Sequence, residues 1–186
     1  MTFVPSIATA GAKLATYVED VRTYIVDGGY DSQEAAAAGV DAEPAYDSAY
    51  TDTGSFVDNF NAGSGANMFD FGSAETGYWS NSQLYHVSWG ASDDSPVPEV
   101  YGCCHASMVN EWLTIDEYAK SNSLGYSVLG VTSDYNSANS CNKTYTPDDS
   151  WNAMLAGIEG DSGAYYQSTI DYLTRLPCNM TFDGVE

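Results

Sequence analysis

Basic residues are scarce in this chain. Its 186 residues include 26 Asp and Glu but only five Lys and Arg, which gives a formal net charge of −21. Nucleic-acid binding depends on Lys and Arg side chains that neutralise phosphates, and docking on anionic lipid depends on the same side chains. The composition therefore excludes nucleic acid as a partner and excludes charge-driven docking on a membrane surface.

Long apolar segments are absent as well. No run of about 18 consecutive apolar residues occurs, so we expect no helix that spans a bilayer. The first five residues lack the basic region of a secretory signal peptide, and no apolar region follows them. We therefore expect synthesis in the host cytoplasm and, if the protein works outside the cell, release by another route such as host lysis.

Recognisable catalytic and metal-binding motifs are also missing. The sequence has no C-x-x-C pair, no G-x-S-x-G elbow and no phosphate-binding loop. Cys104 is next to His105 in sequence, but a catalytic thiol needs a histidine close in space, so His86 is its alternative partner. The Asp-rich segments 47–52 and 93–94 are better explained as solvated acids than as calcium ligands. We predict no catalytic residue, no metal ion, no cofactor and no enzymatic activity.

The four cysteines are Cys103, Cys104, Cys141 and Cys178. All four are candidates for disulfides, and sequence alone does not separate the alternative pairings. A bond between the neighbours Cys103 and Cys104 is strained, so each is expected to pair elsewhere, for example with Cys141 and Cys178. The alternative is that all four are reduced and mostly buried thiols.

Acids and aromatic residues are what the chain has in quantity. Hydrophobic residues make up 44% and aromatic residues 13%, which distinguishes the chain from a disordered acidic protein. The acids are scattered along a chain of single-domain length, as on a solvated surface around one core. At molar salt the Debye length falls to about 3 Å and the repulsion among the acids is screened. We therefore expect a protein adapted to high salt, the alternative being an ordinary acidic protein.

Short aromatic runs separated by Gly, Ser and Asn dominate the rest of the chain. Such runs are typical of antiparallel sandwiches and barrels, so we predict a mainly β fold of about eight strands. The expected strands are 55–61, 67–71, 77–79, 83–89, 100–104, 126–132, 164–173 and 178–182.

Helical spacing occurs in three places. Apolar residues within 1–26 predict a helix, or a helix followed by a strand, that stops at Gly28. Residues 107–120 predict a short helix. A third helix is expected over 151–158, with Asp149 as its cap.

This acidic, aromatic-rich pattern, with a Met-Thr start and no signal peptide, resembles the smaller major capsid protein of tailless, membrane-containing icosahedral viruses of haloarchaea. The resemblance implies a single jelly-roll domain over residues 1–186, with 1–26 as an arm or helix. It also implies self-association and pseudo-hexameric capsomers built with a larger major capsid protein. Penton or minor capsid proteins and an internal membrane are further expected contacts, and the expected location is the virion.

Two alternatives belong to other functional classes. One is a haloarchaeal hydrolase that uses Cys104 or a carboxylate pair, with a pocket that converges on Cys104, His86 or His105. The other is a β-sandwich module for carbohydrate binding or adhesion. That module requires exposed aromatic residues in a row on one face, for example Trp79, Trp89 and Trp151.

Overall fold

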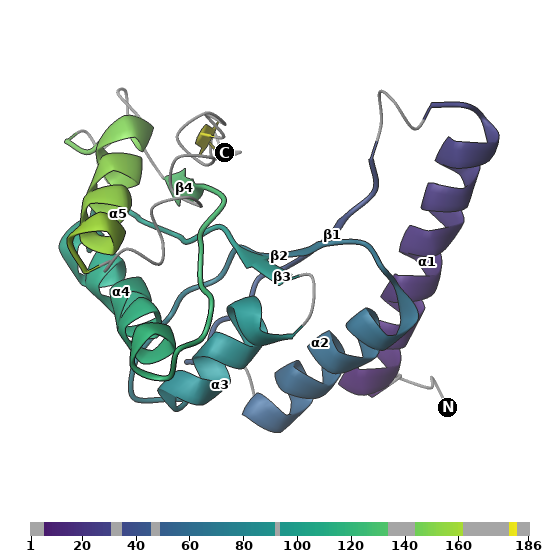
Figure 1. Ribbon diagram of the computed structural model, residues 1–186, viewed down its shortest axis with the longest axis horizontal. Helices are drawn as coiled ribbons and strands as arrows, with labels where there is room; N and C mark the ends of the chain where they lie inside the picture. Colours follow the sequence, from purple (N-terminus) through teal and green to yellow (C-terminus); the bar gives the residue numbers. More distant parts are fainter. Residues whose placement is uncertain are drawn as a thin grey trace.

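Helices and short strands alternate along the chain in the computed structural model, which describes residues 6–30, 35–45, 49–91, 94–133, 144–161 and 179–181 (Figure 1). The elements are α1 (Ile7–Asp27), β1 (Ala38–Val40), α2 (Tyr50–Gly63), β2 (Met68–Asp70), α3 (Asn81–Tyr85), the π-helical turn η1 (His86–Gly90), β3 (Asp94–Pro96), α4 (His105–Ser121), β4 (Val131–Ser133), α5 (Pro147–Asp161) and β5 (Asn179–Thr181).

All of these strands are parallel, and their order in space follows their order in the chain. β1 pairs with β2, β2 pairs with β3, and β4 pairs with β5. The segment after β3 joins the two groups, because Glu99 forms a parallel bridge with Thr132. The backbone N–H of Val100 donates to the Thr132 carbonyl over 2.9 Å, and the N–H of Thr132 donates to the Pro98 carbonyl over 2.8 Å.

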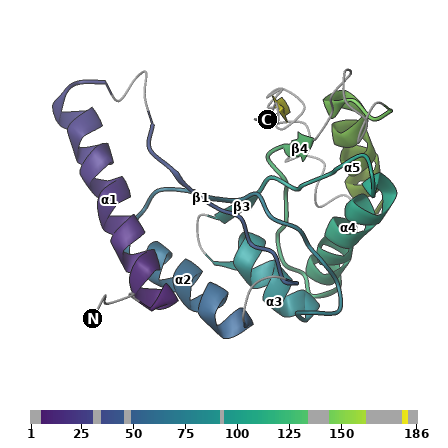
Figure 2. The same cartoon turned by 180° about the vertical axis from the view of Figure 1, so that it is seen from behind.

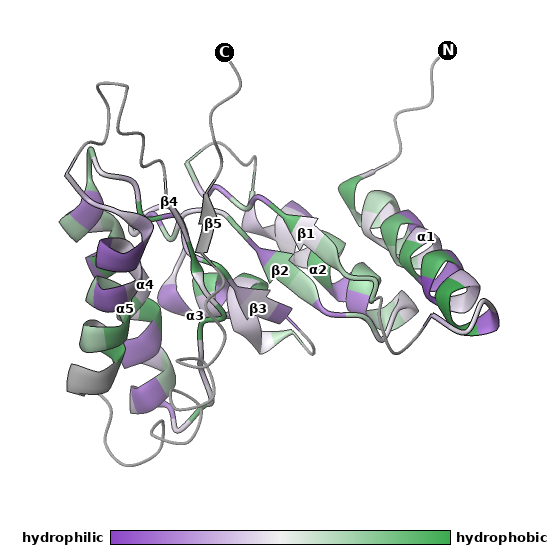
Figure 3. Ribbon diagram, turned by 90° about the horizontal axis from the view of Figure 1, so that it is seen from above, coloured by the Kyte–Doolittle hydropathy of each residue, from purple (hydrophilic) through white to green (hydrophobic). Residues whose placement is uncertain are grey.

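The helices lie along one side of this row of strands. Parallel crossovers are almost always right-handed, so crossovers that advance in one direction place their helices on the same face. Figures 1 and 2 show the helices following one another along the outside of an arc, with the strands on its inner side. Seen from above, α1 and α5 lie at opposite ends of the row (Figure 3).

The prediction of a mainly β jelly roll of about eight strands is wrong. Segment 55–61 lies in α2, where Val57 and Phe60 are completely buried. Its aromatic residues Phe56 and Phe60 are four positions apart, a spacing that fits one face of a helix as well as one face of a strand. Segment 83–89 forms the end of α3 and η1 for the same reason, since its buried residues also recur at helical spacing.

The other predicted strands have mixed outcomes. β2 and β5 confirm the centres of the runs 67–71 and 178–182, and β4 confirms only the end of 126–132. Segments 77–79 and 100–104 are not strands, although Trp79 makes one isolated bridge with Thr76. The run 164–173 lies outside the described residues.

The N-terminal segment is a helix throughout its described part. The Ser6 hydroxyl caps α1 by accepting from the backbone N–H of Thr9 over 3.3 Å, and Gly28 ends the helix as predicted. α1 packs on α2 through small residues, because a Cβ on Gly11 would lie 2.2 Å from the Phe56 carbonyl oxygen. Tyr24, one of the strand formers in this segment, is 72% exposed and does not decide its structure.

The two predicted C-terminal helices are confirmed with different ends. Trp112 and Ile115 of α4 are buried in the core, together with Met154 of α5. Asp149 lies in the first turn of α5 instead of capping it: the Thr146 N–H donates to Asp149 Oδ2 over 2.9 Å, and the Asp149 N–H donates to Thr146 Oγ1 over 3.2 Å. This reciprocal pair is a capping box, which starts the helix earlier than predicted. No helix within the described ranges is long and apolar enough to cross a membrane.

Candidate active site

Acidic side chains follow the first three strands at one edge of the sheet. Because the strands are parallel, their carboxyl ends meet at the same edge, which is where α/β proteins usually bind ligands. Asp41 and Glu43 follow β1, Asp70 is the last residue of β2, and Glu99 comes shortly after β3. We call these four residues the carboxylate edge.

Glu99 lies in an environment that shifts its pKa. Its side chain is half-buried, and the hydroxyl of Tyr101 donates a hydrogen bond to its Oε1 atom. Burial raises the pKa of Glu99 to about 7; the Tyr101 hydrogen bond lowers it, while the negative charges of Asp41 and Glu43 raise it further. A carboxyl group with this pKa is partly protonated at neutral pH and is suited to general acid catalysis.

Asp70 fixes the backbone beside the other acids. It is only 4% exposed, and its Oδ1 accepts from the N–H of Gly72 over 3.0 Å and from the N–H of Ala42 over 3.4 Å. Ala42 lies between Asp41 and Glu43, so this hydrogen bond holds the segment that carries both of them. Gly72 is required here, because a Cβ on it would lie 1.9 Å from the Ala42 carbonyl oxygen.

Two more glutamates extend the acidic region toward α4. Glu75, in the loop after β2, accepts from the Ala45 N–H over 2.9 Å through its Oε2. Glu111 of α4 is half-buried, and burial raises its pKa, with a smaller contribution from the charge of Glu75. The loops after β1 and β2 are therefore held together by hydrogen bonds to acidic side chains.

The loop after β3 carries two of the four cysteines and leads into α4 at His105. Cys103 and Cys104 are exposed, and their sulfur atoms lie 2.8 Å apart. Their expected partners, Cys141 and Cys178, lie outside the described residues. His105 begins α4, is 8% exposed and stacks on the Tyr145 ring with centroids 4.0 Å apart. Burial lowers the pKa of His105, and the charge of Asp149 partly opposes this shift.

His86 does not serve Cys104. Its Nδ1 shares a hydrogen bond with the Tyr50 hydroxyl over 2.9 Å, and its Nε2 lies 3.0 Å from Asp58 Oδ1. Both ring nitrogens are therefore engaged by residues of α2. The pairing of His86 with Cys104, which the hydrolase alternative offered, is therefore replaced by hydrogen bonds of His86 to Tyr50 and Asp58.

The three tryptophans considered for adhesion do not form an exposed row. Trp79 is 8% exposed, and Trp89 and Trp151 are half-buried. Trp89 packs edge-on against Tyr126, with ring centroids 6.2 Å apart. The feature that the sandwich module required is therefore not present at these positions.

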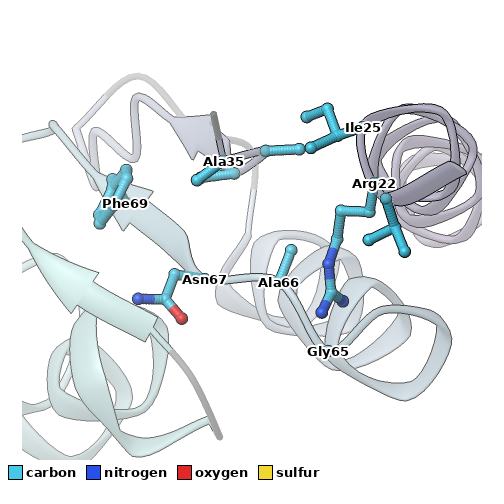
Figure 4. A pocket seen from close by; sticks show the side chains of 10 residues that line it. Arg22, Ile25, Ala35, Gly65, Ala66, Asn67 and Phe69 are labelled. Atoms are coloured by element: carbon cyan, nitrogen blue, oxygen red, sulfur yellow. The ribbon is translucent and has the colours of Figure 1, made fainter. Parts of the chain in front are cut away.

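A pocket of about 390 Å³ lies at the opposite edge of the sheet, between α1 and the segments that lead into β1 and β2 (Figure 4). Its walls are mostly small apolar side chains, and its cationic residue Arg22 pairs with Glu19 over 2.7 Å. Hydrogen bonds from Ser64 and then from Arg22 lower the pKa of Glu19. Because the Arg22 charge is already compensated, this pocket is a weaker candidate than the carboxylate edge.

A groove of about 510 Å³ lies at the carboxyl edge itself, between the loops after β1 and β2. Its lining residues are Pro44, Ala45, Ala49, Tyr50, Thr51, Tyr78, Trp79 and Gln83. Among the described residues, no three His, Cys, Asp or Glu side chains are arranged to hold a metal ion.

No protein-family model, curated protein or solved structure matches this chain. The functional assignment therefore depends on the geometry of the carboxylate edge. Sequence reasoning missed Glu99, Asp41 and Glu43 because 26 acids offer too many pairs. Asp41 directly follows the short apolar strand β1, whereas Glu99 comes three residues after β3, whose residues Asp94, Ser95 and Pro96 are not an apolar run, so no sequence signal singles out Glu99.

Proposed function

We propose that this protein is a hydrolase that cleaves glycosidic bonds by acid–base catalysis, with Glu99 as the general acid. The observation that carries the proposal is the environment of Glu99: burial, with smaller contributions from the charges of Asp41 and Glu43, raises its pKa to about 7, although the hydrogen bond from Tyr101 lowers it. The sequence offered a hydrolase that uses either Cys104 or a pair of carboxylates, and this proposal is the second of these two forms.

The environment gives the carboxylates different roles. Asp41 is exposed to water, whereas burial raises the pKa of Glu99 to about 7, so that Glu99 is partly protonated at neutral pH. Glu99 donates this proton to the leaving oxygen of the substrate. Asp41 or Glu43 then acts on the other side of the bond, as a base on water or as a nucleophile.

Tyr101 supports the proton transfer. Its hydroxyl donates to Glu99 Oε1, which holds the carboxyl group in place and stabilises the anion left after the proton has gone. Tyr101 is therefore a positioning residue in this proposal.

The charge of the site narrows the substrate class. At molar salt the net charge of −21 is screened beyond about 3 Å, but the acids of the carboxylate edge still repel a phosphate ester or another anion bound beside them. Neutral carbohydrates carry the polar leaving oxygens that a protonated carboxyl group serves. We therefore propose a neutral oligosaccharide or polysaccharide as substrate.

The capsid function remains a prediction, but it has lost the jelly-roll fold that the resemblance implied. The proposed hydrolase also departs from the expectation of no enzymatic activity. It is favoured because the same parallel sheet that replaces the jelly roll brings the acids together at one edge.

The test combines a titration with an activity assay at molar salt, where the screening length is about 3 Å. Carbon-detected NMR should show Glu99 titrating near 7 instead of its ordinary 4.5. Release of reducing sugar from a panel of neutral polysaccharides should fall by about a hundredfold or more in Glu99→Gln.

Glu117→Gln is the matched control, because Glu117 is an exposed glutamate on α4. It should leave activity unchanged. Titration of Glu99 at its ordinary value, no release from any of the polysaccharides, or unchanged activity in Glu99→Gln would overturn the proposal.

A further inference from the structure

The groove between the loops after β1 and β2 has a lining of unusual composition. None of its eight lining residues carries a charged side chain, although the chain is rich in acids. Three of the eight are aromatic, and Thr51 and Gln83 add neutral polar groups. The described part of the lining therefore offers ring faces and hydrogen-bonding groups without a fixed charge.

Tyr78 is held in an exposed position. It is 64% exposed and follows Gly77, whose φ of 101° is in the region that favours glycine. The parallel bridge between Thr76 and Trp79 closes this turn, so Trp79 points inward while Tyr78 remains outside. A large ring kept in water by a tight turn is suited to stacking against a ligand.

Tyr50 forms another wall of the groove, and its position is fixed by three contacts. Its ring lies edge-on to Trp79 and to His86, with centroids 5.9 Å away in each case. Its hydroxyl shares a hydrogen bond with His86 Nδ1 over 2.9 Å, and Asp58 binds the other ring nitrogen over 3.0 Å. Burial, and then the charge of Asp58, raises the pKa of Tyr50, so the hydroxyl keeps its proton.

The groove adjoins the carboxylate edge. Pro44 of its lining directly follows Glu43, and the N–H of Ala45 is bound by Glu75. A substrate held in the groove therefore lies next to the acids that follow β1.

We propose that this groove is a subsite for one neutral sugar ring of the substrate, with Tyr78 as the stacking platform and the Tyr50 hydroxyl as a hydrogen-bonding anchor. This inference deepens the proposed function and rests on it. His86 and Asp58 are positioning residues, since they act on the ligand through Tyr50. Gln83 is a further donor, because its Oε1 already accepts from the Ser80 N–H and its amide nitrogen remains to donate.

A sugar fits this lining better than a charged ligand does. An organic cation would bind the ring faces, but none of the eight lining residues that the structure describes is a carboxylate that could pair with it. An anion finds no Lys or Arg among the lining residues. Hydroxyl and amide groups beside aromatic rings match a ring that has both polar edges and apolar faces.

The test is an NMR titration of the full-length Glu99→Gln variant, which should bind without cleaving. The probes are cellotetraose, mannotetraose and tri-N-acetylchitotriose at molar potassium chloride, with choline chloride as a competing ligand class. At least one saccharide should shift the indole signal of Trp79 and the ring signals of Tyr78.

The matched variants are Tyr78→Ala and Tyr17→Ala, because both tyrosines are 64% exposed and Tyr17 lies on α1, away from the groove. Tyr78→Ala should weaken saccharide binding by about tenfold, and Tyr17→Ala should leave it unchanged.

Tyr50→Phe and His86→Ala test the positioning role. Each should weaken binding by about threefold to tenfold, and the double variant should be no weaker than Tyr50→Phe alone. Additive losses would assign His86 a role that does not pass through Tyr50.

Three results would overturn the subsite: no shift with any saccharide, equal effects of Tyr78→Ala and Tyr17→Ala, or binding of choline instead. The activity of Glu99→Gln tests the general acid independently of saccharide binding in the groove. Loss of activity in Glu99→Gln without saccharide binding in the groove removes the subsite and leaves the hydrolase. Saccharide binding with unchanged activity in Glu99→Gln removes the hydrolase and leaves a binding site.

Discussion

Replacing Glu99 by glutamine should stabilise the folded chain at alkaline pH. Its pKa rises from 4.5 in the unfolded chain to about 7 in the folded protein, chiefly through burial. Between these values the folded state holds a proton that the unfolded chain has released, so the free energy of unfolding falls as pH rises. This difference corresponds to at most about 3 kcal/mol, since one pKa unit is worth about 1.4 kcal/mol.

Glutamine has nearly the same shape as protonated glutamate but does not ionise. The difference in unfolding free energy between Glu99→Gln and the unchanged protein should therefore be small at about pH 4 and reach up to about 3 kcal/mol at about pH 8. Above pH 7 the unchanged protein carries the full cost of a half-buried anion, and the variant does not.

The assay is urea unfolding followed by tryptophan fluorescence, at constant molar salt and at both pH values. The contributions of acids far from Glu99 are the same in both proteins and cancel in the difference. Glu117→Gln should give a difference near zero throughout. A Glu99→Gln variant that is destabilised equally at both pH values would refute the reasoning, because it would show that Glu99 ionises in the folded protein as it does in the unfolded chain.

Three further predictions concern the fold. Gly11→Ala should lower the free energy of unfolding by about 2 kcal/mol or more, because the added Cβ would lie 2.2 Å from the Phe56 carbonyl oxygen. The control is Gly125→Ala, whose Cβ would lie 3.7 Å from the nearest atom. In the same urea experiment this control should change the free energy of unfolding by less than about 0.5 kcal/mol. Thr146→Ala should cost about 1 kcal/mol by removing the capping box with Asp149, and unchanged stability would contradict that role. If the chain is adapted to brine, its thermal midpoint should rise steeply between low and molar potassium chloride, and a flat dependence would count against that expectation.

The helices with a single buried face were the predictable part of the fold. In α4, Trp112 and Ile115 lie on the buried face that their spacing indicated, and the stop at Gly28 was readable at the end of α1. Segment 55–61 was predicted wrongly because its two phenylalanines are four residues apart, a spacing that fits both the helical and the strand period. In addition, the small residues of α1 against which α2 packs are far away in the sequence.

The strands were hard to predict because each described strand is three residues long. So short a segment carries almost no period. All three residues of β3 and of β4 are buried, so these strands show no alternation that the sequence could reveal. The candidate site depends on these strands. Asp41 and Glu99 are 58 residues apart in the numbering and share an edge only because β1 and β3 run in the same direction.

The chain-ordered row of strands also has a consequence for how the protein forms. α1 packs on α2, α3 on α4, and α4 on α5, so most interhelical packing joins neighbours in the chain. Packing between neighbours in the chain allows each strand and helix to add to the preceding ones as the polypeptide leaves the ribosome. Asp41 and Glu43 are then in place before Glu99 emerges, and the acidic cluster is completed only when the third strand has been added.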